Sequence, residues 1–146
     1  MQIQNGQVRE GLAQIEQGMA DYSAAGTEAT RSYFPPLLAE AYSEAGQAEE
    51  GLVVINEALA TVHKSGMRIF EAELYRIKGN LLLAFPSENH GEAEISFRKA
   101  IDVARGQKAK SLELRVTMSL SRFLQHQGKA EEARGILAEI YGWFTE

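Results

Sequence analysis

Three histidines, His63, His90 and His126, are the residues of this chain best suited to bind a metal or to transfer protons. A histidine metal site on a helix needs close ligand spacing, such as H-E-x-x-H. The three histidines are far apart in the sequence, and no such spacing occurs. His90 opens a segment that reads as a helix start, so a capping or solvent-facing role is expected there. We therefore predict no metal site.

Neighbouring glutamates recur along the chain and could in principle form an acid–base pair. Each group falls where the sequence predicts the first turn of a helix, and a negative charge is favoured there by the helix dipole. These glutamates therefore have a structural explanation; they are Glu49, Glu50, Glu92, Glu94, Glu131 and Glu132.

Other catalytic patterns are also missing from the sequence. The glycine pairs Gly6…Gly11 and Gly46…Gly51 have phosphate-loop spacing, but leucine follows each pair where the loop requires lysine. No cysteine is present, which excludes a thiol nucleophile, a thiolate zinc site and disulfides. The serines suggest no Ser-His-Asp arrangement. We predict a chain without catalytic residues or cofactors.

The elements that would position any site are predicted to be helices. Strong helix formers dominate the sequence, runs of β-branched residues are absent, and only three prolines occur. No stretch is apolar enough for a membrane span, and the first residues lack the features of a secretion signal. Together with the absence of cysteine, this makes a cytoplasmic location the expectation. The fold class is predicted to be all-α.

Four segments, residues 6–15, 46–55, 88–97 and 128–137, align as internal repeats. In each, a small residue is followed four positions later by a large apolar one, and a further position three residues on completes one helix face. The aligned small residues lie at nearly constant intervals, and their large partners follow in the same order: Gly11, Gly51, Ala93 and Ala133, then Ile15, Ile55, Phe97 and Leu137.

A second helix with its own pattern precedes three of these segments. Its middle residue is small and is followed by a large side chain, as in Ala39 with Tyr42. Glycines at Gly46 and Gly128 predict left-handed helix caps. Pro35 and Pro36 predict that one helix either begins near Pro35 or bends there. About seven helices are expected, over residues 7–25, 30–45, 47–64, 69–85, 90–106, 110–127 and 129–143.

This arrangement of small and large residues resembles the tetratricopeptide (TPR) repeat. The resemblance implies a right-handed superhelical solenoid of antiparallel helix pairs, with units at about 1–26 (incomplete), 27–66, 67–107 and 108–146. The period is longer than in the usual TPR. In this it is similar to the repeats in the sensor regions of maltose-activator-type bacterial regulators.

A closer resemblance rests on three stretches, Glu71–Leu83, Ser111–Leu124 and Ala138–Glu146. They resemble the C-terminal TPR region of bacterial signalling proteins that join a class III adenylate/guanylate cyclase to a STAND/AAA-type ATPase. The resemblance implies that the chain is a fragment of a larger protein with nucleotide chemistry in preceding domains. The chain itself has only two aspartates, Asp21 and Asp102, both in predicted helices, and so lacks the cyclase metal site.

The TPR resemblance also implies a binding groove, because the first helix of each TPR pair lines the concave face. Arg76 and Asn80 match positions that carry a base and an asparagine in TPR modules that clamp a peptide carboxylate; Arg115 and Ser119 supply at most part of a second half. The candidate groove residues are Tyr33, Glu40, Glu73, Arg76, Asn80, Arg115, Ser119 and Arg122.

These features favour a non-catalytic protein-interaction or regulatory segment, with a protein or peptide partner in the groove. Apolar residues near both ends further predict self-association. Net charge is −5, and the locally basic second half reads as a solvated surface, so no nucleic-acid partner is expected. The alternatives are a ligand- or partner-sensing solenoid of a transcription regulator and a structural oligomerisation spacer. An open groove is expected to suit a small molecule poorly.

Overall fold

The computed structural model describes residues 9–14, 16–17, 28–66, 68–86, 88 and 90–145, with side chains except at 28–34 and 143–145. Within these ranges the chain forms helices and turns and no strand, which confirms the all-helical prediction. Residues 9–14 and 16–17 are helical. The longer helices are α2 (Glu28–Glu44), α3 (Ala48–Ser65), α4 (Glu71–Leu82), α5 (His90–Gly106), α6 (Lys110–His126) and α7 (Ala130–Thr145).

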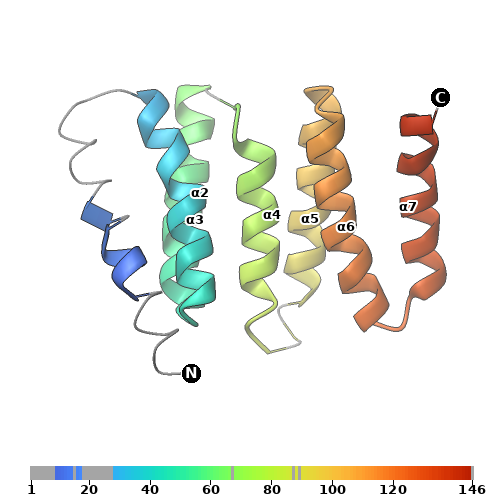
Figure 1. Ribbon diagram of the computed structural model, residues 1–146, viewed down its shortest axis with the longest axis horizontal. Coiled ribbons are helices and arrows are strands. Elements are labelled where there is room, and N and C mark those ends of the chain that lie inside the picture. The colour runs from blue at the N-terminus through green and yellow to red at the C-terminus, as the bar shows by residue number, and fades with distance from the viewer. Residues whose placement is uncertain are drawn as a thin grey trace.

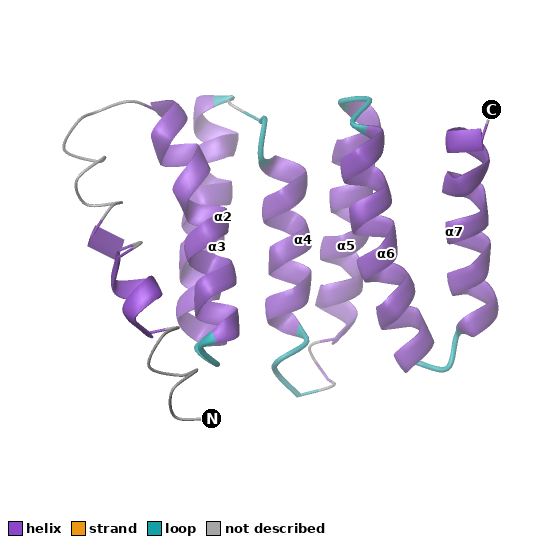
Figure 2. Ribbon diagram, in the orientation of Figure 1, coloured by secondary structure: helices purple, strands orange, loops and turns teal. Residues whose placement is uncertain are grey.

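The helices lie side by side in chain order along the longest axis of the molecule (Figure 1). Short loops join them, so consecutive helices run in opposite directions (Figure 2). Each of α2 to α6 packs against the next helix in the chain, and α4 also contacts both α2 and α6. The helices α2, α4 and α6 therefore form one layer. None of the helices in the described ranges is long and apolar enough to cross a membrane.

Helix α2 does not begin near Pro35, because it runs from Glu28 through both prolines. Each proline lacks the amide that would bond to the carbonyl four residues earlier. Both proline rings are buried, and this burial offsets part of the cost of the missing hydrogen bonds. The first turns of α2 thus form despite the local preference against helix before proline.

Helix α4 ends at Leu82, three residues before the predicted end. The amides of Leu83, Ala84 and Phe85 donate to carbonyls three residues earlier, at N···O distances of 3.2, 3.1 and 3.2 Å. This tighter winding is common at helix ends, and Pro86 then cannot continue the helix.

The predicted left-handed caps are present at Gly46 and Gly128, with φ of 74° and 77°. After α2, the Gly46 amide donates to Ser43 and the Gln47 amide donates to Tyr42. The same pair of backbone hydrogen bonds closes α6 and α5. At the end of α5 the left-handed position is occupied by Lys108, with φ of 57°. A non-glycine residue thus adopts this conformation at the α5–α6 turn.

The core follows the row of helices as two clusters instead of gathering at one centre. One cluster joins α2, α3 and α4 around Ile55, and the other joins α4 to α7 around Phe97. Leu52 and Tyr75 pack against both clusters. The core is therefore built by neighbouring helices, each burying its face on the next.

Most of the predicted repeat positions lie in this core. Phe97 and Ile55 are fully buried, as are the small residues Ala93 and Ala133. Gly79 lies against Phe97, since a Cβ on Gly79 would be 2.6 Å from the Phe97 ring. The pattern weakens at the ends, where Leu137 is only half-buried; Ile15 lies outside the described residues.

Candidate functional site

The predicted groove residues lie on one face of the layer formed by α2, α4 and α6. On α4, Glu73, Arg76 and Asn80 are three and four residues apart, which places them on one side of the helix. Arg115, Ser119 and Arg122 follow the same spacing on α6. The structure brings seven of the eight candidates to two adjoining pockets. Tyr33 belongs to α2, but its side chain lies outside the described part.

Arg76 is the centre of an ion-pair cluster between the two pockets. Its Nη2 donates to Glu73 Oε1 at 2.6 Å and to Glu40 Oε1 at 2.8 Å, and its Nε donates to Glu73 Oε2 at 3.0 Å. Arg115 Nη1 lies 3.5 Å from Glu73 Oε1. Arg76 is 7% exposed, so its hydrogen bonds are largely protected from solvent.

The charge of Arg76 is secured by these two carboxylates. Burial by itself lowers the pKa of Arg76, but the hydrogen bonds to Glu73 and Glu40 outweigh it and raise the pKa above its ordinary value. Removing either the arginine or its carboxylate partners would leave a buried charge unpaired, which is strongly destabilising. Arg76 therefore holds α2 and α4 together, in addition to reaching the binding face.

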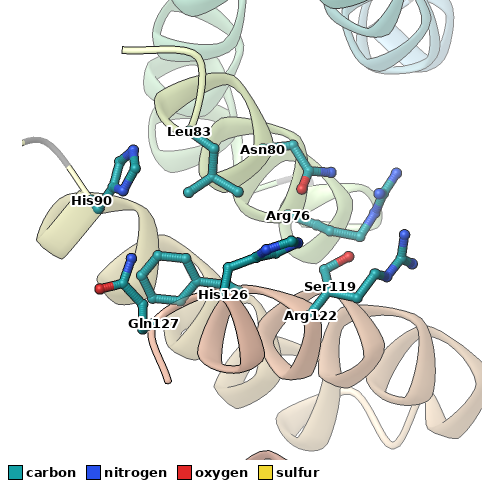
Figure 3. Close-up of a pocket in the computed structure, with 9 residues that line it drawn as sticks. Arg76, Asn80, Leu83, His90, Ser119, Arg122, His126 and Gln127 are labelled. Carbon is teal, nitrogen blue, oxygen red and sulfur yellow. The ribbon is translucent and has the colours of Figure 1, made fainter. Parts of the chain in front are cut away.

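The first pocket, here called the polar pocket, lies between α4 and α6 and has a volume of about 410 Å³ (Figure 3). Arg76 and Asn80 approach it from α4, and Ser119 and Arg122 from α6. Leu83 and Phe123 supply an apolar wall near His90. The lining residues are Arg76, Asn80, Leu83, His90, Ser119, Arg122, Phe123, His126 and Gln127.

The second pocket, here called the apolar pocket, adjoins the other side of the ion-pair cluster and has a volume of about 450 Å³. It spans the beginnings of α4 and α6 and the middle of α2. Two of its apolar side chains are open to solvent, Leu37 at 40% and Ile69 at 67% exposure. The lining residues are Pro36, Leu37, Glu40, Ile69, Phe70, Glu73, Leu112 and Arg115.

The polar pocket is a partly open cavity, which the expectation of an open groove did not anticipate. Leu83, directly after α4, and His90, the first residue of α5, flank the α4–α5 connection and line one end of the pocket. The repeat pattern contains no information on this connection, whose sequence differs between units. The size of the pocket is within the range of small-molecule sites.

Sequence reasoning also missed several lining residues. His126 lies one helical turn after Arg122, so extending the spacing on α6 would have found it. His90 belongs to α5 and reaches the pocket from the other layer, and no spacing on the first helices indicates it. The apolar lining, including Ile69 and Leu112, was missed because the search followed polar residues only.

The other residues considered from the sequence have local structural roles. His90 Nε2 lies 3.2 Å from the Phe85 carbonyl, and its ring packs edge-on against Phe123. Glu92 lies in the first turn of α5 as predicted, whereas Glu94 lies beyond that turn and pairs with Arg98 at 3.2 Å. In the described ranges, no three histidine, aspartate or glutamate side chains are placed to share a metal ion.

Comparisons with protein-family models, with curated proteins and with solved structures each found no match to this chain.

Proposed function

We propose that this chain is a non-catalytic helical-repeat segment that binds a protein or peptide partner on the face formed by α2, α4 and α6. The arrangement of helix pairs, with α4 contacting both α2 and α6, is compatible with a TPR-like right-handed solenoid. In such a fold the layer of first helices is the binding surface.

The apolar pocket carries this proposal. Leu37 and Ile69 expose apolar surface beside a rim of charged residues, Glu40, Glu73 and Arg115. Protein interfaces commonly combine an apolar centre with a polar, solvent-accessible rim. The pocket offers a partner an apolar anchoring point and charges that define its orientation.

The sequence resemblance extends the proposal to a biological setting. On that basis the chain is a regulatory segment of a bacterial signalling protein that carries a cyclase or an ATPase in other domains. A second candidate is the ligand-sensing solenoid of a transcription regulator, which the size of the polar pocket favours.

The proposal is tested by capture of partners from a lysate of the source organism with three forms of the chain. Ile69→Lys places a charge in the apolar pocket, whereas Ile95→Lys makes the same change on α5. The two isoleucines are 67% and 68% exposed, so both variants should fold equally well. We expect Ile69→Lys to lose the partner and Ile95→Lys to retain it. Equal capture by both variants, with circular dichroism unchanged, would contradict a role for this face.

A further inference from the structure

The polar pocket has a charge that nothing in the described structure balances. Arg76 and Arg122 line it, and no acidic side chain does. Arg76 already bonds to Glu40 and Glu73, and Arg115 lies near Glu73 outside this pocket. Arg122 makes no ion pair with any residue that the structure describes.

Counting these charges indicates the kind of ligand. Arg76, Arg115 and Arg122 carry three positive charges, whereas Glu40 and Glu73 carry two negative charges. One positive charge is therefore left over, at the Arg122 end. A single carboxylate would balance this excess, and the planar guanidinium matches a carboxylate with two parallel hydrogen bonds. Asn80 lines the same pocket, and its side-chain amide can donate a hydrogen bond to the same group.

The opposite end of the pocket calls for a different chemical group. Leu83 and Phe123 provide an apolar wall there, and the Phe123 ring packs edge-on against His90. His90 Nε2 lies 3.2 Å from the Phe85 carbonyl, and its Nδ1 is buried away from solvent. The His90 ring therefore adds to the wall of the pocket, and this end favours the apolar part of a ligand.

We propose that the polar pocket binds a free small-molecule carboxylate with an apolar body. The carboxylate pairs with Arg122, and the body packs on Leu83 and Phe123. The volume of about 410 Å³ is suited to a molecule of this kind. This site goes beyond the protein-binding role and does not depend on it.

The test uses 3-(4-hydroxyphenyl)propanoate as the probe and follows binding to the full chain by NMR titration. Its neutral carboxamide and 3-phenylpropanoate are the comparison ligands. We expect the carboxamide to bind about tenfold more weakly or worse, because it loses the charged hydrogen bonds. We expect 3-phenylpropanoate to bind about as tightly as the probe, because it keeps the carboxylate and the apolar body.

Arg122→Gln should weaken binding of the probe by about tenfold or more, whereas Arg134→Gln on α7 should leave it unchanged. Arg134 is an exposed arginine whose pair with Glu131 makes it a matched control for surface charge. Circular dichroism establishes that both variants fold. Equal affinity for acid and carboxamide, equal effects of the two variants, or no binding of the probe would overturn the proposal.

A final binding experiment distinguishes a free small-molecule carboxylate from the C-terminal carboxylate of a peptide. The peptide Gly-Gly-Gly-Gly-Tyr with a free C-terminus presents the same chemical groups on a chain end. If the free acid binds as tightly as the peptide or more tightly, the small-molecule proposal stands. Binding of the peptide about tenfold more tightly would overturn it and identify the pocket as a reader of chain ends.

Discussion

At the scale of single residues, the three helix-ending turns at 46, 108 and 128 use the same backbone conformation with different side chains. Gly46 and Gly128 adopt positive φ without steric cost, whereas Lys108 carries a Cβ in the left-handed region. No atom lies within 4 Å of a Cβ added at Gly128, so the conformation alone decides the effect of a substitution there.

We predict that Lys108→Gly stabilises the chain and that Gly128→Ala destabilises it, each by about 1 kcal/mol. The two changes are opposite substitutions at equivalent positions. Urea unfolding monitored by circular dichroism measures both free energies of unfolding. A loss of stability in Lys108→Gly would mean that the lysine side chain makes a contribution that outweighs its backbone strain.

Buried carboxylates at the starts of α4 and α6 are a second residue-scale feature. Glu71 and Glu113 are almost completely buried, at 0% and 2% exposure, and each accepts a hydrogen bond of 2.7 or 2.9 Å from an arginine. The hydrogen bond to Glu113 raises the pKa of Arg105 despite the opposing effect of burial. These pairs join each first helix to the segment before it. Sequence reasoning treated Arg105 as part of a solvated basic surface and did not identify this pairing.

At the scale of helices, the distance between neighbours is set by small residues. Because Gly79 has no Cβ, the Phe97 ring of α5 can pack directly against the backbone of α4. Glycine inside a helix costs about 1 kcal/mol relative to alanine, so a glycine there requires a packing benefit. Gly135 in α7 has no atom within 4 Å of an added Cβ and provides the comparison.

We predict that Gly79→Ala lowers the free energy of unfolding by about 1–2 kcal/mol, because the clash with the buried Phe97 ring exceeds the gain in helix propensity. Gly135→Ala should raise it by about 1 kcal/mol. Thermal and urea unfolding of the two variants test this difference in sign. Stabilisation by both substitutions would show that the α4–α5 contact can open without cost.

At the scale of the whole molecule, the ends of the row differ from its middle. Helices α3 to α6 each pack against helices on two sides, whereas α7 packs mainly against α6 and is joined to α5 by the Arg98–Glu132 ion pair of 2.9 Å. Tyr141 on this last helix is 65% exposed. The side chains of Trp143 and Phe144, which belong to the apolar residues near this end of the sequence, lie outside the described part. Exposed apolar side chains on one surface favour association.

We therefore predict that the chain self-associates at high concentration and that Tyr141→Glu weakens this association. Light scattering across a concentration series measures the mass of the wild type and the variant. Met118→Glu is the control, since Met118 is 46% exposed on α6. A monodisperse monomer at high concentration would contradict the prediction.

The sequence by itself determined the all-helical class, the positions of helices α2 to α7 to within a few residues, and much of the core that the structure describes. These features follow from local rules: residues three and four apart share a helix face, and Gly46 and Gly128 favour a left-handed cap. The same rules selected Arg76 and Asn80 together with Arg115, Ser119 and Arg122 as neighbours on one surface.

Only the tertiary structure decided what these residues contact. The engagement of Arg76 by Glu40 depends on the packing of α2 against α4, and the pairing of Arg105 with Glu113 depends on the α5–α6 turn. Leu83 and His90 line the polar pocket from the two sides of the α4–α5 connection, whose path the repeat does not encode. A helix period specifies direction around one axis, whereas a pocket depends on the distance and angle between axes, which side chains from several helices set together.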